Sequence, residues 1–480
     1  MIRLGIGGAI AATVTAATLA VPGEVEEARA AAPTPPNVIV IMTDDMRVDD
    51  LAEMPKTRRL LAGTNGANYT KAHVTTPLCC PSRATFLTGQ YAHNNGVYDN
   101  AGPNGSVDSL DDTSTLPVWL QSAGYRTVMF GKYLNGYGLP SDGTAATYVP
   151  PGWDHWAALS HRTMSNYTDF DITVGSSTPD ASSTGAIEHV ANGYQTWNFT
   201  GRAVSRIRAS VPLDQPMFMW LSLFAPHPGA GDFPHQSVPA EPKYQGTSTV
   251  GLPTSPAVDE ARIADKPPWI KALPRLTDRD KARIVTHRRE RRNALRSVDD
   301  SVSRVVDALR DAGELDNTVI IFTSDNGLML GEHRITHWKT VPYLEAARVP
   351  LLIRGPGFTS GTRTEPVSNV DLAPTVADVS GVTPTLPVDG ISLLGPIGAN
   401  RPILLEYLGD PVPIGMPAYG SVIQGRWQYS TYETSQELYD LADDPWQLQN
   451  RIGDPSTVDV RQRLAVILAE LRDCAGQSCR

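Results

Sequence analysis

Four short apolar runs constrain the fold of this chain more than any other feature of its sequence. They cover residues 37–42, 126–130, 217–224 and 318–322, and each stops abruptly at polar side chains. Short runs of this kind are typical of strands that are buried on both faces, as in the sheet of an α/β fold. We therefore expect an α/β architecture with these four segments as strands.

Reactive side chains follow each of the four predicted strands. The segments are Thr43-Asp44-Asp45, Gly131-Lys132, Ala225-Pro226-His227 and Thr323-Ser324-Asp325-Asn326. In α/β sheets the ligand crevice lies beyond the carboxyl ends of the strands. Any single segment could be a turn or a loop cap. Together they predict that carboxylates, an amide, a lysine and a histidine meet at one place.

Helix and loop patterns lie between the predicted strands. Apolar residues recur at spacings of three and four over residues 295–309, which predicts an amphipathic helix packed on the sheet. The basic segment 287–292 could contact an anionic substrate, but we favour a solvated helix face. Residues 229–275 are rich in proline and serine and predict a long ordered loop near the site.

The character of the sequence changes at about Arg401. The elements expected beyond it are strands over 402–407, 420–429 and 437–439 and a helix over 458–472. Because 480 residues exceed one ordinary domain, we expect two parts. These are a catalytic domain over residues 33–400 and a smaller α+β subdomain over residues 401–480.

Residues 1–32 predict an export signal. Arg3 gives a positive start, residues 4–21 are apolar and rich in small side chains, and Ala28-Arg29-Ala30 has the pattern of a cleavage site. A retained anchor is the alternative, but Pro22 interrupts a weakly hydrophobic run, and no later stretch is long enough to span a bilayer. We expect a secreted protein, and its net charge of −10 argues against nucleic acid as a partner.

The four cysteines fall into two unlike pairs. Cys474 and Cys479 close a short loop near the C-terminus, and in an oxidising compartment they predict a local disulfide. A loop of this size contributes only about 2 kcal/mol in the chain-entropy model. Cys79 and Cys80 are adjacent, and adjacent cysteines rarely have the geometry for a bridge. Two unpaired thiols in an exported protein therefore call for an explanation.

The segment around these two thiols is the most informative motif of the chain. Pro81 suits the first position of a helix and Gly89 suits its end. Cys79 would then lie just ahead of the helix, where free N–H groups and the helix dipole favour an anion. A buried structural cysteine is the ordinary alternative, but it does not explain two thiols at such a position.

The motif resembles the signature of the sulfatase family, Cys-x-Pro-Ser-Arg followed by Leu-Thr-Gly. This chain has Cys79-Cys80-Pro81-Ser82-Arg83 and Leu87-Thr88-Gly89, so only Cys79 is in register and Cys80 fills the variable position. Further matching segments follow the family order over nearly the whole mature chain. They are Thr43-Asp44-Asp45, Gly131-Lys132 and residues 323–327, 331–333, 348–352, 371–375 and 437–440.

The resemblance implies an alkaline-phosphatase-like fold, with a large mixed-sheet domain and a smaller C-terminal α+β subdomain. It implies that a formylglycine-generating enzyme oxidises Cys79 to formylglycine before or during export. It also implies one metal ion, held by residue 79 and by Asp44, Asp45, Asp325 and Asn326. A crowded cage of oxygen donors suits Ca²⁺ better than Mg²⁺, which tends to keep its waters.

The family mechanism then assigns the remaining roles. Hydrated formylglycine is a geminal diol, and the metal ion with Arg83 favours one hydroxyl as the nucleophile that attacks sulfur. The second hydroxyl expels sulfate and regenerates the aldehyde. Lys132 and Lys339 would neutralise the sulfate oxygens, and His227 would protonate the leaving oxygen.

One position departs from the family pattern. Many sulfatases follow Gly-Lys with a bulky residue and then a histidine that contacts the formylglycine, whereas this chain has Leu134 at that position. The proton of the diol must then be handled by another group, such as Asn135 or a histidine from elsewhere. His333 and His337 are near Lys339 in the sequence, and either could lie behind it.

Several strings resemble the glucosamine-6-sulfatase branch of the family. They are Cys79-Cys80, Gly131-Lys132-Tyr133-Leu134-Asn135, Pro150-Pro151-Gly152-Trp153 and Ser297-Val298-Asp299-Asp300. The resemblance suggests a 6-sulfated amino sugar of the kind found in glycosaminoglycans, and a generic aryl sulfate should react as well. Trp269 and Tyr244, or Trp153 and Trp156, could stack on a sugar face, although core packing is the ordinary role of a tryptophan.

Two other functions stay open. A phosphomonoesterase or phosphodiesterase of the same fold usually holds two metal ions and uses Ser or Thr as its nucleophile, so Cys79 and the single ligand set favour sulfate. A binding protein with unmodified Cys79 would keep the fold but would not need the whole basic set. That set, Arg83, Lys132, His227 and Lys339, is present.

Overall fold

The computed structural model describes residues 8–9, 11–13, 35–139, 146–210, 215–229 and 237–480. The predicted export signal lies outside the described residues except at positions 8–9 and 11–13, so its removal stays a prediction. Residues 35–480 form one compact unit, and the expected division between residues 400 and 401 also stays a prediction. In the described part of the chain no helix is long and apolar enough to cross a membrane.

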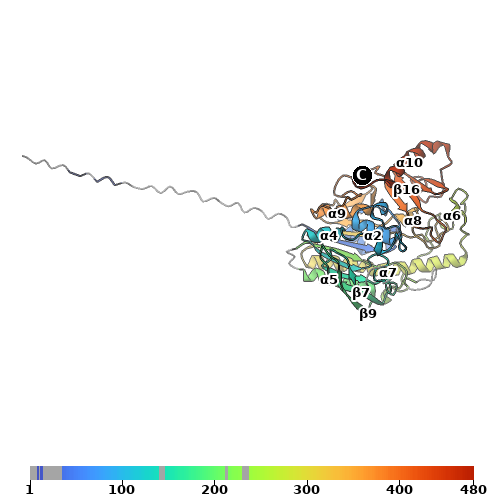
Figure 1. Ribbon diagram of the computed structural model, residues 1–480. Coiled ribbons are helices and arrows are strands. Elements are labelled where there is room, and N and C mark those ends of the chain that lie inside the picture. The colour runs from blue at the N-terminus through green and yellow to red at the C-terminus, as the bar shows by residue number, and fades with distance from the viewer. Residues whose placement is uncertain (1–7, 10, 14–34, 140–145, 211–214, 230–236) are drawn as a thin grey trace, which may run out of the picture. The chain divides into compact units, whose positions relative to one another are not determined.

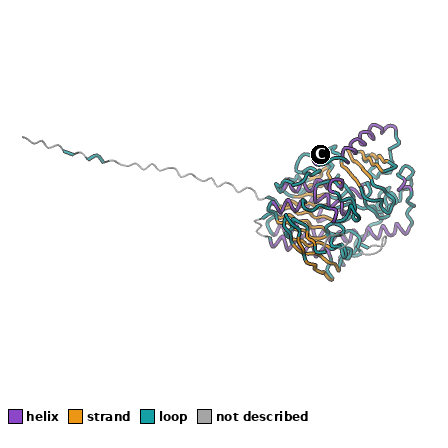
Figure 2. Tube along the Cα trace, viewed as in Figure 1, coloured by secondary structure: helices purple, strands orange, loops and turns teal. Residues whose placement is uncertain are grey.

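A ten-stranded mixed sheet is the centre of this unit (Figures 1 and 2). Its strands, in spatial order, are β13 (Gly361–Arg363), β2 (Ala67–Tyr69), β12 (Leu351–Arg354), β11 (Thr318–Ser324), β1 (Asn37–Thr43), β10 (Met217–Ser222), β4 (Arg126–Gly131), β6 (His155–Leu159), β7 (Asp169–Gly175) and β9 (Ala186–Ala191). The strands from β11 to β6 run parallel, and antiparallel pairs flank them on both sides.

The four predicted strands are neighbours in this sheet. They are β11, β1, β10 and β4, and each is almost entirely buried, as the apolar runs predicted. β10 ends at Ser222, two residues earlier than expected, and β11 continues two residues further to Ser324. Because the four strands are adjacent and parallel, their carboxyl ends share one edge of the sheet.

Helices cover both faces of the sheet (Figure 1). Val38 and Val40 of β1 pack in one core with residues of α2, α4 and α9, whereas Ile39 and Ile41 pack in another with residues of α5 and α7. This alternation explains why β1 is apolar at every position. The α-helices among the described residues are α1 (Pro55–Leu61), α2 (Cys79–Thr88), α3 (Ala92–Asn95), α4 (Leu116–Ser122), α5 (Gln195–Ala209), α6 (Pro268–Lys271), α7 (Asp278–Asp311), α8 (Leu344–Ala347), α9 (Leu372–Val379) and α10 (Val458–Arg472).

The predicted helix over residues 295–309 is the second half of α7. The expectation of a solvated basic face ahead of it was wrong. Arg288, Arg291 and Arg292 are buried and pair with three carboxylates of the segment that follows β1: Asp49, Asp50 and Glu53. The basic segment therefore connects α7 to residues 49–53, which follow the end of β1.

A second sheet of four antiparallel strands lies in the C-terminal part of the chain. Its strands are β15 (Ile403–Tyr407), β16 (Tyr419–Gln424), β17 (Trp427–Tyr432) and β18 (Gln436–Asp440). The single strand expected over residues 420–429 is instead a hairpin, because Gly425, with a φ of 63°, allows a tight turn between β16 and β17. The helix expected over residues 458–472 is confirmed as α10. Two further short sheets are formed by β3 (Ala72–His73) with β14 (Val367–Ser368) and by β5 (Tyr148–Val149) with β8 (Ser183–Thr184).

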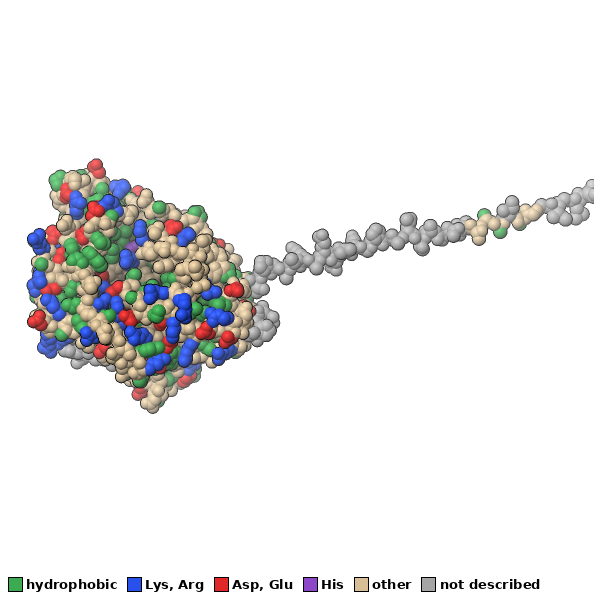
Figure 3. Space-filling model, turned by 180° about the vertical axis from the view of Figure 1, so that it is seen from behind, with side chains coloured by type: hydrophobic (Ala, Val, Ile, Leu, Met, Phe, Trp, Pro, Cys, Tyr) green, Lys and Arg blue, Asp and Glu red, His purple; other side chains and the backbone are tan. Residues whose placement is uncertain are grey.

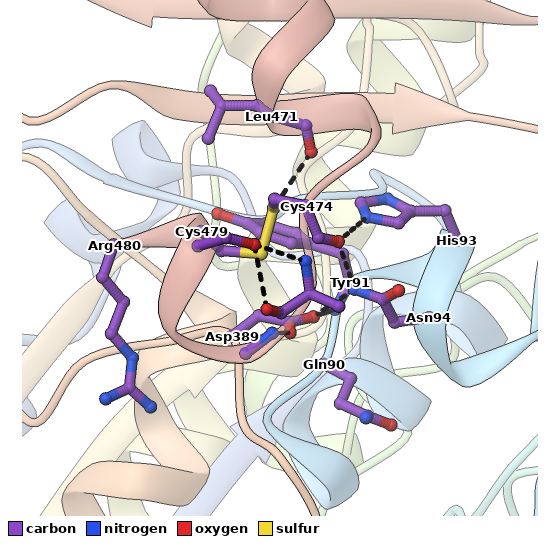
Figure 4. Close-up of a disulfide and its surroundings, with 12 residues drawn as sticks. Gln90, Tyr91, His93, Asn94, Asp389, Leu471, Cys474, Cys479 and Arg480 are labelled. Carbon is purple, nitrogen blue, oxygen red and sulfur yellow. Dashed lines mark hydrogen bonds between the residues drawn. A yellow bond between two sulfur atoms is a disulfide. The ribbon is translucent and has the colours of Figure 1, made fainter.

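The predicted disulfide between Cys474 and Cys479 is present (Figure 4). The bridged loop is anchored to α3 and to the segment that follows α9. Asn94 Nδ2 donates to the carbonyl of Cys474 at 2.9 Å, and the N–H of Gly476 donates to Asp389 Oδ1 at 2.7 Å. The loop is therefore part of the packed structure.

Charged side chains of both signs are spread over the face of the molecule drawn in Figure 3. Lysine and arginine side chains lie beside aspartate and glutamate side chains across this face.

Candidate active site

The carboxyl ends of β11, β1, β10 and β4 bring the predicted site residues together. One oxygen each of Asp44, Asp45 and Asp325 lie within 4.8 Å of one another. The same holds for one ligand atom each of Asp44, Cys79 and His227. Four strand ends and the start of α2 thus form a single cluster of charged and nucleophilic groups.

Helix α2 begins at Cys79, two residues before the start expected at Pro81. A proline in the first turn is tolerated because the N–H that it lacks would have no partner within the helix. The first intrahelical bond runs from the N–H of Ser82 to the carbonyl of Leu78 at 3.0 Å. Gly89 ends the helix with a φ of 68°, as predicted. Cys79 therefore sits in the first turn of the helix.

The two thiols have different surroundings. Lys339 Nζ donates to Cys79 Sγ at 2.8 Å, and Cys79 Sγ lies 3.6 Å from Asp44 Oδ1. Cys80 packs in the apolar core, and its N–H donates to Asn100 Oδ1 at 2.9 Å. Burial, assisted by Asp44, raises the pKa of Cys79 to about 11, and burial raises that of Cys80 to about 12. An unmodified Cys79 is thus a protonated thiol and a poor nucleophile at neutral pH.

Two lysines neutralise the carboxylates that follow β1. Lys132 Nζ pairs with Asp44 Oδ2, and Lys339 Nζ donates to Asp45 Oδ1 at 2.5 Å. Burial opposes the charge of each lysine, but the neighbouring carboxylates outweigh it and raise the pKa of both. Burial also opposes the charge of Asp45 and by itself would raise the pKa of this carboxyl. Lys339 and His227 outweigh burial and hold the pKa of Asp45 well below its usual range.

Arg83 is fully buried and joins the strand ends to one another. Its Nε donates to Asp325 Oδ2 at 2.8 Å, and its Nη1 donates to the carbonyl of Lys132 at 2.8 Å and to Ser222 Oγ at 2.7 Å. Its Nη2 lies 3.6 Å from Asp44 Oδ2. This fork geometry, which a lysine cannot reproduce, makes Arg83 a positioning residue in this structure. Ser222 was not predicted, although it is the one polar side chain in its apolar run.

The oxygen donors of the cluster fit a hard cation. Asn326 Nδ2 donates to Asp45 Oδ1 at 2.6 Å and to the carbonyl of Gly327 at 2.8 Å. Its Oδ1 is buried and has no hydrogen-bond partner among the described residues. A buried acceptor without a donor calls for an explanation. A bound cation would explain it, because the amide oxygen and the three carboxylates beside it are the kind of ligands that Ca²⁺ prefers.

Asp45 adopts a backbone conformation that is unusual for a residue with a side chain. Its φ is 66°, and its N–H donates to Asp325 Oδ1 at 3.1 Å. Arg291 Nη2 donates to its carbonyl at 2.5 Å, and Arg291 Nη1 donates to the carbonyl of Pro226 at 3.2 Å. Strain of this kind persists where surrounding contacts fix it. Arg291 of α7 therefore helps to fix the backbone positions of Asp45 and of the loop that carries His227.

His227 faces the cluster through its Nε2 atom. This atom lies 3.8 Å from Asp45 Oδ2, while Nδ1 donates to the carbonyl of Pro228 at 2.8 Å. Burial lowers the pKa of His227 to about 3, because the attraction of Asp45 does not make up for it. The ring is thus neutral in the substrate-free structure, with its proton on Nδ1 and a lone pair on Nε2.

The groups suggested for the role of the missing family histidine lie in different surroundings. Leu134 packs in the apolar core. The side-chain oxygen of Asn135 is buried and has no hydrogen-bond partner among the described residues, and its backbone carbonyl accepts the N–H of Val107. A ring nitrogen of His227 lies within 4.8 Å of Cys79 Sγ, so His227 stays a candidate for this role.

His333 and His337 occupy different places. Nδ1 of His333 lies 2.7 Å from Glu260 Oε2, and the ring stacks on Tyr343 with centroids 4.1 Å apart, so this histidine belongs to a buried network. His337 lines the cavity described next, and its ring packs edge-on against that of His287.

A cavity of about 350 Å³ opens over Asp45, His227 and Lys339. Its apolar lining comes from Leu78, Pro228, Leu328, Trp338, Pro411, Val412 and Pro413, and its other polar lining from Asp99, Asn100, His337, Thr340, Tyr407 and Asp410. The cavity therefore joins the reactive cluster to a mixed wall of the kind that binds small polar ligands.

The tryptophans suggested for sugar stacking do not line this cavity. Trp153 and Trp156 are buried in the core on one face of the sheet, and Trp269 packs against Tyr343 in another core. The long loop was expected near the site, but its described part, residues 237–275, contributes no residue to the cavity wall. Trp338 lines the wall instead, and it lies one residue before Lys339.

Comparison with known proteins agrees with this arrangement. The sulfatase family profile matches residues 36–382, and a profile for the C-terminal part of N-sulphoglucosamine sulphohydrolase matches residues 331–474. An arylsulfatase of Volvox carteri is 33% identical over 94% of this chain and 76% of that protein. The N-acetylglucosamine-6-sulfatase of Homo sapiens is 30% identical over 93% of this chain and 86% of that protein.

The fold has close counterparts among solved structures. One, described as a complex with its substrate D-glucosamine-2-N,6-O-disulfate, superposes with a TM-score of 0.75. It covers 92% of this chain and 98% of that one at 23% identity. The alkaline-phosphatase-like fold expected from the sequence is thus confirmed, and this chain belongs to the sulfatase family, hydrolases of sulfate esters.

Proposed function

We propose that this sulfatase hydrolyses sulfate monoesters of 6-sulfated amino sugars, and aryl sulfates as well, through a formylglycine at residue 79. The observation that carries the proposal is the position of Cys79. It is the one of two adjacent thiols that contacts both Lys339 and Asp44, in a cluster of three carboxylates.

Conversion of Cys79 accounts for its surroundings. With its pKa raised to about 11, the thiol itself is a weak nucleophile at neutral pH. The hydrated aldehyde of formylglycine would place an oxygen where the sulfur now lies. Because the side chain is 1% exposed, we expect a formylglycine-generating enzyme to act on the chain before it folds.

One Ca²⁺ ion is the metal that we propose for the cluster. Its protein ligands would be residue 79 together with Asp44, Asp45, Asp325 and Asn326. Bound there, the ion would polarise a hydroxyl of residue 79 and a sulfate oxygen. The unpartnered oxygen of Asn326 and the three buried carboxylates support a hard cation with many oxygen ligands.

The basic residues would bind the sulfate group. Lys132 and Lys339 now pair with Asp44 and Asp45. With Asp44 and Asp45 committed to a metal ion, both ammonium groups would be able to turn their donors towards sulfate oxygens. Arg83 would keep Asp325 and Asp44 in place throughout the reaction.

His227 is the group that we propose for protonating the leaving oxygen. Its Nδ1–H is committed to the carbonyl of Pro228, so a transferable proton would have to be on Nε2. The negative charge of a bound sulfate ester would raise the pKa of the ring and so favour its uptake of a proton from solvent at Nε2. The cavity wall beside His227 leaves room for the alcohol to depart.

The substrate proposal rests on the relatives and on the cavity. The similar human protein is named for N-acetylglucosamine 6-sulfate, and the similar algal protein for aryl sulfates. A cavity of about 350 Å³ with both apolar and polar walls suits a sulfated sugar of the glycosaminoglycan type. The disulfide supports export to an oxidising compartment, which the N-terminal segment predicts.

The two adjacent cysteines offer a matched pair of variants to test this proposal. Cys79→Ala should abolish the hydrolysis of an aryl sulfate and of N-acetylglucosamine 6-sulfate, because it removes the nucleophile. Cys80→Ala should keep substantial activity, because the side chain of Cys80 packs in the apolar core and the substitution keeps the backbone N–H that contacts Asn100. Turnover of both esters by the two variants decides the matter, and equal losses would contradict the assignment of residue 79.

A further inference from the structure

The cavity over Lys339 has a second polar region that the proposed mechanism does not use. Asp99, Asn100, Tyr407 and Asp410 form it. Asn100 links this region to the first turn of α2, since its Oδ1 accepts the N–H of Cys80. The region therefore borders the space in front of the reacting group and belongs to the same cavity.

Asp99 is held in place by two donors. Its Oδ1 accepts the N–H of Asn100 at 2.6 Å, and its Oδ2 accepts the hydroxyl of Tyr407 at 2.6 Å. Tyr407 lies in β15 and is 1% exposed. The carboxylate of Asp99 is thus a fixed acceptor with spare lone pairs beside the cavity.

Neither carboxylate of this region has a cationic partner. Within the described ranges, no ion pair joins Asp99 or Asp410 to a Lys, Arg or His side chain. Asp99 is half-buried, and Asp410 is exposed on the loop that follows β15. The carboxylates at the reactive end differ, because Asp44 and Asp45 each pair with a lysine. A half-buried carboxylate without a cation favours a ligand that brings one.

We propose that Asp99 and Asp410 make the cavity select its substrate by charge. The favoured substrate is a 6-sulfated amino sugar with a free, cationic amine, and the disfavoured one carries a second sulfate on that nitrogen. The inference rests on the proposed sulfatase function, because it places the 6-sulfate at Lys339 and the rest of the sugar against the wall.

The size of the cavity makes this selection effective. A volume of about 350 Å³ is near the lower end for ligand pockets, so a sugar bound there contacts the wall. Trp338, Leu78 and Val412 supply apolar surface for a ring face. In the proposed orientation, an N-sulfate would face Asp99 and Asp410, and such like-charge contacts disfavour binding strongly.

Three sugars that differ only at nitrogen test the proposal. They are glucosamine 6-sulfate, N-acetylglucosamine 6-sulfate and glucosamine 2-N,6-O-disulfate. For the wild-type enzyme we expect kcat/KM for 6-sulfate release to fall in that order, with about tenfold or more between the first and the last. High salt should reduce the differences in kcat/KM among the three sugars, because screening weakens contacts between charges.

Isosteric variants separate charge from shape. Asp99→Asn combined with Asp410→Asn should reduce the preference for the free amine over the N-sulfate by about tenfold, mainly by improving the disulfated sugar. Asp316→Asn is the matched control, because Asp316 is fully exposed and outside the cavity wall. An unchanged preference in the double variant would overturn the proposal, as would an equal change in the control. Asp410→Asn alone should reduce the same preference in part. Because this side chain is exposed, a folding defect cannot explain such a result.

Inhibition separates this inference from the proposed function. The same three sugars can be measured as inhibitors of aryl sulfate hydrolysis. If none is hydrolysed but the amine inhibits best, the amino-sugar substrate is wrong and the charge selection stands. If all are hydrolysed without any charge preference, the function stands and the selection is wrong.

Discussion

At the scale of single residues, the site is a balance of buried charges. Lys132 and Lys339 each occupy a carboxylate oxygen that a metal ion would claim. Under the proposed function, a cation would compete with the two ammonium groups for these oxygens and would leave the lysine donors for the sulfate group. We therefore expect the cation to bind before the anionic substrate.

Calcium should stabilise the folded protein as well as activate it. Removal of metal should abolish hydrolysis, and Ca²⁺ should restore it better than Mg²⁺. Because the ion would bind only the folded chain, calcium at 100 times its Kd should add about 2.7 kcal/mol to the free energy of unfolding. Thermal unfolding with and without Ca²⁺ measures this.

Asn326→Ala provides the contrast for the calcium test. The variant lacks the unpartnered oxygen that we assign to the ion, so its melting temperature should rise less with Ca²⁺ than that of the wild type. An equal rise in both proteins would remove Asn326 from the ligand set. Stoichiometric zinc pairs in the purified protein would favour a phosphatase instead.

His227 should matter most for substrates with a poor leaving group. His227→Ala should reduce kcat/KM for N-acetylglucosamine 6-sulfate by about 100-fold or more. The loss for an aryl sulfate should be much smaller, because a phenolate departs without protonation. His189→Ala is a suitable control, since that histidine lies exposed on β9. Equal losses on the two esters would show that His227 is not the acid.

At the scale of elements, α7 supports the strand ends from behind. Arg291 is completely buried, and it contacts the carbonyls of Asp45 and Pro226 and the carboxylate of Asp50. These contacts join α7 to the ends of β1 and β10. The helix therefore contributes to the geometry of the site without reaching the substrate.

Loss of Arg291 should destabilise the protein and disturb the site. Arg291→Met removes the buried ion pair between Arg291 and Asp50 and leaves Asp50 only the longer contact to Arg292, and breaking a buried ion pair typically costs about 3–5 kcal/mol. Arg289→Met on the same helix is the control, because Arg289 is exposed and, among the described residues, donates to the carbonyl of Val250 alone. Urea unfolding compares the two, and similar midpoints would contradict the role given to Arg291.

The elements that could be predicted from sequence are those with a local signal. The apolar runs located β1, β4, β10 and β11, and the signature around Cys79 located α2. The buried arginines of α7 could not be predicted, because their partners lie more than 200 residues away at Asp49 and Glu53. The sequence of a basic helical segment is the same whether its arginines pair with buried carboxylates or face water.

The cavity wall could be predicted even less well than the elements. The residues of its second polar region come from the loop after α3 and from β15 and its following loop, which are distant in sequence. Tryptophans were expected to stack on a sugar, but most of them fill cores, because their large apolar surface gains more from full burial. Trp338 could have been suspected from its position beside Lys339.

At the scale of the whole molecule, the two parts expected from the sequence share one active cavity. Tyr407 and Asp410 of the C-terminal part line it together with Lys339 and His227. Polar contacts tie this part to the rest, as where Tyr343 donates to Glu437 at 2.9 Å. The C-terminal sheet is therefore needed to complete the substrate wall.

The central claim is that residue 79 of the mature enzyme is formylglycine. Trypsin should release a peptide spanning residues 72–83, which contains both adjacent cysteines and ends at Arg83. Mass spectrometry of this peptide from active enzyme should find an aldehyde at residue 79 and an intact thiol at Cys80. Two intact thiols in a preparation with full sulfatase turnover would contradict the account.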